Sequence, residues 1–123
     1  MKEITYIHAE GYPAGELKHG PIAMIDPGMT VVVLAPKDDL YDKTISNLQE
    51  VKARGGYIVS IGNKGDGPLQ KLSDQFLGYD FTNDFSDVIL STIPLQLLSY
   101  HAAVLRGTDV DKPRNLAKSV TVE

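Results

Sequence analysis

Two strand patterns on either side of one helical pattern constrain this chain more than any other feature of its sequence. Residues 30–34 (TVVVL) and 57–61 (YIVSI) are rich in β-branched side chains, as is typical of strands buried on both faces. Between them, residues 40–54 carry apolar side chains at helical spacing, after Asp38 and before the glycine pair at 55–56. A strand, a helix and a strand within this length form a βαβ crossover, so the sequence predicts an α/β fold with a parallel sheet.

The sequence outside that crossover predicts one more strand and one long helix. The strand is expected near residues 75–79, and an apolar helix is expected over residues 88–106, with Pro94 in its first turn or at a kink. Partial helix is predicted over residues 13–25, and an extended tail from Asp109 onward.

The apolar segment over residues 88–105 has no formal charge, and its eighteen residues are about the length at which a membrane helix becomes a candidate. It also contains more polar and helix-disturbing residues than a lone span tolerates, which favours a buried core helix. These residues are Ser91, Thr92, Pro94, Gln96, Ser99, Tyr100 and His101. The start of the chain (MKEITYIHAE) lacks the layout of a signal peptide, so we expect a cytoplasmic protein without a membrane span.

Composition excludes several classes of protein. The chain has 123 residues and no cysteine, so a disulfide framework, an iron–sulfur cluster and a cysteine nucleophile are all excluded. Twelve basic against 16 acidic side chains give a net charge of −4, which argues against a nucleic-acid-binding surface. The length fits one domain or part of one.

Metal-ligand spacing is absent from the sequence. The three histidines, His8, His19 and His101, lie on separate predicted elements. Glu16 and His19 have the i, i+3 spacing used in di-iron bundles, but such a centre needs this motif twice. The loop at 62–68 (GNKGDGP) matches neither phosphate-binding glycine pattern, so a plain surface turn is predicted, with no helix directly after it. The sequence therefore predicts no metal and no cofactor.

Three polar side chains have an open interpretation when only pattern is considered. His19 lies in a glycine-flanked stretch, where a side chain can be presented at a cleft, and a solvated loop histidine fits the same pattern. Lys118 and Glu3 lie near the chain ends, where solvated surface groups are usual. Pattern alone thus indicates an α/β fragment without a defined function.

Two motifs nevertheless resemble a known family. Residues 8–21 (HAEGYPAGELKHGP) resemble the H-A-E-x-x-x-x-G-E-x-K-H-G-P motif of sugar-isomerase (SIS) domains. Residues 106–123 (RGTDVDKPRNLAKSVTVE) are similar to the C-terminus of the glutamine–fructose-6-phosphate aminotransferase (isomerizing), or glucosamine-6-phosphate synthase, family, and residues 46–56 and 94–98 agree with it too. The resemblance covers nearly the whole chain.

The resemblance implies a particular architecture. It is a partial SIS-type three-layer αβα sandwich with a mostly parallel sheet, in which residues 1–108 form the C-terminal portion of a SIS domain. Residues 109–123 would form an irregular C-terminal active-site tail. Family enzymes also contain an N-terminal glutaminase domain and a first SIS domain, both missing here, so an incomplete and inactive fragment and a homodimer are implied.

The resemblance also implies a chemistry, the conversion of fructose 6-phosphate and glutamine-derived ammonia to glucosamine 6-phosphate. His19 corresponds to the histidine that opens the sugar ring, and reaches the neighbouring subunit's site in the family. Lys118 corresponds to the lysine that forms a Schiff base at the ketose C2, and Glu3 to the glutamate that moves a proton between C1 and C2. Arg114 and Ala117 would bind the substrate. The alternatives are a regulatory module that binds a sugar phosphate without chemistry, and an assembly piece that completes its sheet with another chain.

Overall fold

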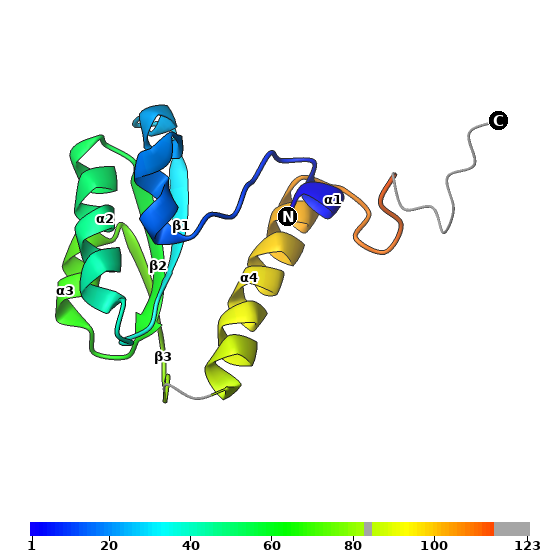
Figure 1. Ribbon diagram of the computed structural model, residues 1–123. Helices are drawn as coiled ribbons and strands as arrows, with labels where there is room; N and C mark the ends of the chain where they lie inside the picture. Colours follow the sequence, from blue (N-terminus) through cyan, green and yellow to red (C-terminus); the bar gives the residue numbers. More distant parts are fainter. Residues whose placement is uncertain (83–84, 115–123) are drawn as a thin grey trace. The chain divides into compact units, whose positions relative to one another are not determined.

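The structure, a computed structural model, describes residues 1–82 and 85–114. The chain forms two compact units (Figure 1). Residues 12–91 make up the first, here called the sheet unit. Residues 1–11, together with residues 92–114, make up the second among the described residues, here called the terminal unit.

The sheet unit contains a parallel sheet of three strands. The strands β1 (Thr30–Ala35), β2 (Tyr57–Asn63) and β3 (Gln75–Tyr79) lie in the order β1-β2-β3 and all pair in parallel. Helix α2 (Tyr41–Ala53) connects β1 to β2, and α3 (Gly67–Leu72) connects β2 to β3 (Figure 1). The predicted α/β fold with a parallel sheet is confirmed.

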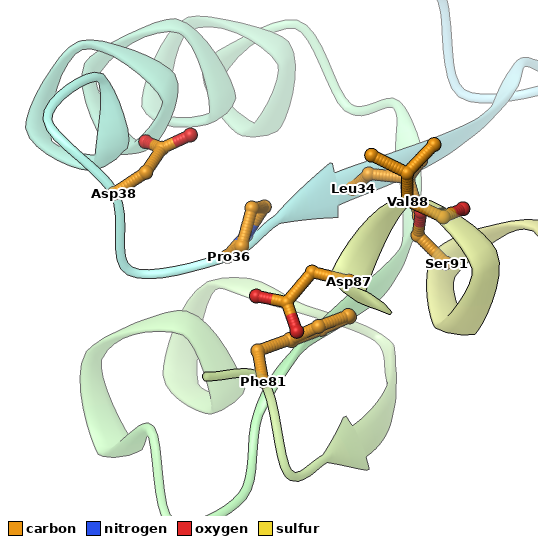
Figure 2. Close-up of a pocket in the computed structure, with 7 residues that line it drawn as sticks. All are labelled: Leu34, Pro36, Asp38, Phe81, Asp87, Val88 and Ser91. Atoms are coloured by element: carbon orange, nitrogen blue, oxygen red, sulfur yellow. Dashed lines mark hydrogen bonds between the residues drawn. The ribbon is translucent and has the colours of Figure 1, made fainter. Parts of the chain in front are cut away.

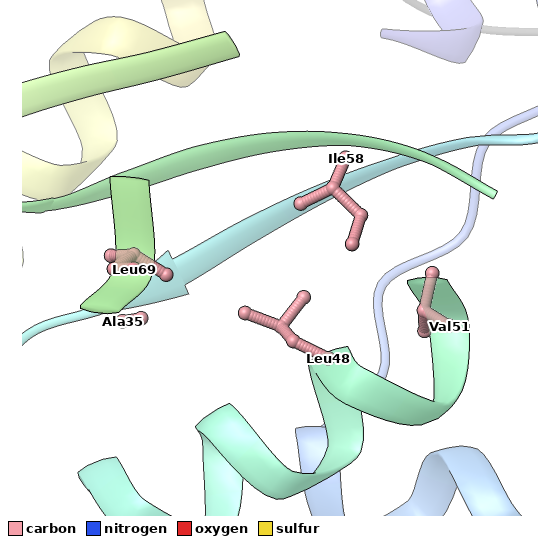
Figure 3. Close-up of a cluster of buried hydrophobic side chains, with 5 residues drawn as sticks. All are labelled: Ala35, Leu48, Val51, Ile58 and Leu69. Atoms are coloured by element: carbon pink, nitrogen blue, oxygen red, sulfur yellow. The ribbon is translucent and has the colours of Figure 1, made fainter. Parts of the chain in front are cut away.

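The core of the sheet unit lies between one face of the sheet and the helices α2 and α3 (Figure 3). Alternate strand residues point to the same face, which brings Ala35 and Ile58 into contact with the helices. Helical spacing places Leu48 and Val51 of α2 on the facing side, and Leu69 of α3 completes the cluster. Val51, Ile58 and Leu69 are 0% exposed, so truncation of any of them should cost about 2–5 kcal/mol.

A buried carboxylate begins helix α3. Asp66 is 0% exposed, and its Oδ1 accepts hydrogen bonds from Tyr41 Oη at 2.7 Å and from the Leu69 N–H at 3.1 Å. It therefore caps α3 and also connects α3 to the first turn of α2. Burial and the adjacent Asp66 carboxylate raise the pKa of Tyr41 well above its usual value. The prediction that no helix follows the turn at 62–68 is wrong, because an aspartate cap and Pro68 together begin one.

The segment before the sheet is helical in two short 3-10 pieces. The first, η1, spans Ala14–His19, the second, η2, spans Pro21–Met24, and Gly20 separates them with a φ of 145°. Asn47 donates a hydrogen bond from Nδ2 to the Ala14 carbonyl at 2.9 Å, which holds η1 against α2. The predicted partial helix in this segment is confirmed.

Helix α4 (Ser86–Leu105) confirms the long apolar helix but not its predicted burial. Its buried residues are Pro94 and Ala103, and apolar residues such as Val88 and Leu105 are exposed. The prediction of a buried core helix is wrong for most of α4. Burial of an apolar helix requires apolar neighbours on every side, and the described residues provide few of them. By length and composition alone, α4 is long and apolar enough to cross a membrane. This is weak evidence for a membrane span, because the core helices of soluble proteins pass the same test.

Candidate functional site

The five residues with a predicted role in a site do not all belong to one unit. Glu3 and Arg114 belong to the terminal unit, and His19 belongs to the sheet unit. Ala117 and Lys118 lie outside the described residues. Of the predicted site, the structure therefore brings together the segments that carry Glu3 and Arg114.

Glu3 lies on α1 (Lys2–Thr5), a single helical turn that sequence analysis did not predict. Thr5 fixes this turn, because it is fully buried and its hydroxyl donates to the Met1 carbonyl at 2.9 Å. The same hydroxyl accepts from the Ile7 N–H at 3.1 Å, which holds the chain that leaves the turn. Glu3 itself is exposed, so a buried threonine supports a turn that presents a carboxylate to solvent.

Residues 108–114, here called the strap, lie against α1 and the residue that follows it. At one end, the Thr108 hydroxyl donates to the Ile4 carbonyl at 2.6 Å. At the other end, the Arg114 N–H donates to Tyr6 Oη at 2.9 Å, and its guanidinium carbon lies 3.9 Å from the centre of the Tyr6 ring. The two ends of the described chain are thereby joined by two hydrogen bonds and one cation–π contact.

His19 ends η1 with its side chain 71% exposed. Its Nδ1 lies 2.8 Å from Glu16 Oε2. A carboxylate only accepts hydrogen bonds, so Nδ1 donates to Glu16, and in the neutral ring Nε2 is then the acceptor. The neighbouring Lys18 pairs with Glu50 of α2, and this hydrogen bond lowers the pKa of the Glu50 carboxyl. The 3-10 turn therefore presents the His19 imidazole to solvent with Nδ1 bonded to Glu16, so Nε2 is the ring nitrogen that can exchange a proton with an external group.

A hollow of about 310 Å³ lies beyond the carboxyl ends of β1 and β3 in the sheet unit (Figure 2). It is lined by Leu34, Pro36, Asp38, Phe81, Asp87, Val88 and Ser91. Ligands of α/β folds often bind at this edge of a sheet, but the carboxylates of Asp38 and Asp87 disfavour a phosphate here. The predicted site residues lie elsewhere, and within the part of the chain that the structure describes no three of His, Cys, Asp or Glu group to hold a metal ion. Sequence analysis missed this hollow, although its wall includes the Asp38 that follows β1.

Comparison with protein families gives a match to the SIS domain over residues 1–106. Three curated relatives are named glutamine–fructose-6-phosphate aminotransferase [isomerizing]. The one from Bacteroides thetaiotaomicron is 56% identical, the one from Pseudomonas aeruginosa 59%, and the one from Thermus thermophilus 57%, each over 123 residues. These alignments cover 100% of this chain and 20% of each relative, so the chain spans about a fifth of their length.

A solved structure is similar over most of the same residues. The C-terminal domain of glucosamine-fructose-6-phosphate aminotransferase from Francisella tularensis matches with a TM-score of 0.80 and 52% sequence identity. The match covers 89% of this chain and 31% of that chain. Fold and sequence thus agree on one group of relatives, and in both comparisons this chain corresponds to a part of the longer molecule.

Proposed function

The chain belongs to the SIS domain family, and from this membership we propose that it forms the C-terminal part of the isomerase region of a glutamine–fructose-6-phosphate aminotransferase. The family prediction made from the two sequence motifs is confirmed. The observation that carries the proposal is the alignment of all 123 residues at 56–59% identity, because it includes the tail as well as the SIS portion. The family match ends at residue 106, which supports a division into a SIS portion at 1–108 and a tail at 109–123.

In this proposal the reaction converts fructose 6-phosphate and ammonia to glucosamine 6-phosphate. His19 exchanges a proton through Nε2 to open the sugar ring. The exposed imidazole of His19 is compatible with a role in the active site of the neighbouring subunit of a homodimer. The Lys118 amine attacks the ketose C2, water leaves, and ammonia then displaces the lysine to give the sugar imine. Glu3 removes a proton from C1 and delivers one to C2, while the proton of the C1 hydroxyl passes to the imine nitrogen, which leaves an aldehyde at C1 and an amine at C2. The exposure of Glu3 on α1 supports such a role.

Arg114 and Ala117 are proposed to bind the sugar phosphate. The face of the Arg114 guanidinium lies over the Tyr6 ring. The N–H groups in the plane of the guanidinium have a geometry that suits a phosphate. This chain alone is proposed to be inactive, since it spans a fifth of its relatives and needs a glutaminase domain and a first SIS domain as partners. We place the assembled protein in the cytoplasm as a homodimer.

Grafting tests this proposal. The chain would replace the homologous C-terminal fifth of one of the curated relatives, and formation of glucosamine 6-phosphate from fructose 6-phosphate and glutamine would be measured. We expect turnover by the graft, and loss of both turnover and borohydride trapping of fructose 6-phosphate in Lys118→Arg. Lys43→Arg is the matched control, because Lys43 is an exposed lysine on α2. Trapping that persists in Lys118→Arg would remove Lys118 from the mechanism, and sugar binding without turnover would favour the regulatory module.

A further inference from the structure

The imidazole of His19 is bonded to a carboxylate of its own helical turn, that of Glu16. We propose that Glu16 is a positioning residue for His19: by accepting from Nδ1 it orients the ring and makes Nε2 the nitrogen that exchanges protons with the sugar. The inference rests on the proposed function for the role of His19, whereas its geometry comes from described residues of the sheet unit.

The form of the helix gives the first argument. The segment η1 is a 3-10 helix, which has three residues per turn, so side chains three positions apart lie directly above one another. Glu16 and His19 have this spacing, and Glu16 Oε2 lies 2.8 Å from His19 Nδ1. In an α-helix the same two side chains would be offset by about 60° around the axis. The 3-10 form therefore brings the carboxylate directly to the ring.

The attachment of η1 to helix α2 gives the second argument. At the start of η1, Asn47 donates from Nδ2 to the Ala14 carbonyl at 2.9 Å, and Asn47 is only 8% exposed. Near the end of η1, the Lys18 ammonium pairs with the carboxylate of Glu50, which also lies 3.6 Å from Arg54. Asn47 and Glu50 are three residues apart and lie on one face of α2. One helix face therefore holds the turn at both ends and keeps its backbone in place.

The boundaries of η1 give the third argument. The Glu16 N–H donates to the Pro13 carbonyl at 2.9 Å, which begins the turn at a residue with a restricted backbone. Gly20 follows His19 with a φ of 145°, a conformation that suits glycine and that turns the chain away. His19 is therefore the last residue of a turn whose length is set on both sides, with the carboxylate one turn before it.

The chemistry of ring opening gives the fourth argument. One group must take the proton of the C2 hydroxyl and return a proton to the ring oxygen, while the bond from C2 to that oxygen breaks and the C2 carbonyl forms. In a neutral imidazole only one nitrogen has the lone pair for this step. The His19 side chain is 71% exposed, so its ring would sample several orientations if nothing held it. The bond to Glu16 favours the form with the lone pair on Nε2 and restricts these orientations.

The first test uses the chain itself, labelled with nitrogen-15 histidine, and requires no sugar. At a pH of about 8.5 free histidine is neutral, and the nitrogen-15 chemical shifts then give the ratio of the Nδ1–H form to the Nε2–H form. Glu16→Ala removes the acceptor, and Glu16→Gln keeps an acceptor without the charge. His8 is the internal reference, because its Nε2 lies 3.7 Å from Glu10 Oε1, which is beyond hydrogen-bond distance.

We expect the ratio of Nδ1–H to Nε2–H at His19 to exceed that at His8 by about fivefold in the unaltered chain, as an exposed hydrogen bond to a carboxylate would give. The ratio at His19 should fall to the His8 value in Glu16→Ala and lie between the two in Glu16→Gln. Equal ratios at His19 and His8 in the unaltered chain, or a ratio at His19 that Glu16→Ala leaves unchanged, would overturn the proposal.

The second test measures kcat and KM in the graft. Glu16→Ala should lower kcat about tenfold and leave the KM for fructose 6-phosphate within about twofold, and Glu16→Gln should recover most of kcat. Asp42→Ala, which alters an exposed acid on α2, is the control and should change neither. An unchanged kcat in Glu16→Ala beside a lost one in His19→Ala overturns the positioning role. Full turnover in His19→Ala would instead count against the proposed function.

Discussion

Replacement of Asp66 should separate hydrogen-bond geometry from charge as the source of stability where β2 meets α3. The Asp66 side chain is 0% exposed, and its Oδ1 serves both Tyr41 Oη at 2.7 Å and the Leu69 N–H at 3.1 Å. Oδ2 has no hydrogen-bond partner among the described residues, and Lys37 Nζ is 4.0 Å away. One oxygen therefore stabilises the junction of two helices, while the other is a buried acceptor without a donor.

The expected cost depends on which oxygen a variant keeps. Asp66→Ala removes the helix cap, worth about 1 kcal/mol, and the hydrogen bond from Tyr41, worth about 1.5–3 kcal/mol, so a loss of roughly 3 kcal/mol is expected. Asp66→Asn keeps an acceptor at Oδ1 and removes a buried charge, so it should cost about 1 kcal/mol or less. Tyr41→Phe removes one donor from the carboxylate and should cost about 2 kcal/mol.

Urea unfolding at neutral pH, followed by circular dichroism, measures these differences in the free energy of unfolding. Asp42→Ala is the control, because Asp42 is an exposed acid on the same helix as Tyr41. If Asp66→Asn is as destabilising as Asp66→Ala, charge rather than geometry stabilises the junction. If Asp66→Ala lies within about 0.5 kcal/mol of the unaltered chain, the junction contributes nothing and the reasoning fails.

The same junction predicts a response to alkaline pH. Burial and the Asp66 carboxylate raise the pKa of Tyr41, so the folded chain holds the phenolic proton at pH values where the unfolded chain has released it. The stabilising contribution is complete below a pH of about 10 and is lost as the pH rises above it. Unfolding at increasing pH should therefore show a steeper loss of stability in the unaltered chain than in Tyr41→Phe, and parallel curves would contradict the assignment.

Two further predictions concern the sheet unit. Gly62→Ala should cost about 1–3 kcal/mol in thermal or urea unfolding, because a Cβ there would lie 3.0 Å from the Ala35 carbonyl oxygen; Gly11→Ala, which meets nothing within 4 Å, is the control. A hydrogen bond from the Ile58 N–H lowers the pKa of Asp74, so its contribution to stability is present above a pH of about 4 and is lost as the pH falls. Asp74→Asn should flatten the acid side of the stability curve, and an unchanged acid midpoint would argue against this role.

The fold was predictable where the pattern is periodic and local. The strands at 30–34 and 57–61 and the helix between them follow from β-branched runs and helical spacing, both of which depend on neighbouring residues. Helix α3 was missed because it depends on the side chain of Asp66 as a cap, which reads as an ordinary loop residue in GNKGDGP. The prediction that α4 is buried was wrong, because composition shows that a helix is apolar but does not show which residues surround it.

The candidate site was predictable only as far as motifs extend. The family motif identified His19, but its pairing with Glu16, and hence the role of Nδ1 as the donor, came from the structure. The contact between Tyr6 and Arg114 joins residues 108 positions apart, and neither belongs to a periodic pattern, so no spacing rule could suggest it. Ala117 and Lys118 lie outside the described residues, so their predicted roles stay predictions.

The joining of distant chain segments in the terminal unit has a consequence for the order of folding during synthesis. The sheet unit is built from segments that follow one another, so it can form while the ribosome is still adding residues. The bond between Ile4 and Thr108 spans 104 positions, and that between Tyr6 and Arg114 spans 108. Translation must therefore pass residue 114 before the turn at residues 2–5 acquires these partners, so the terminal unit can only be completed after the sheet unit has been synthesised.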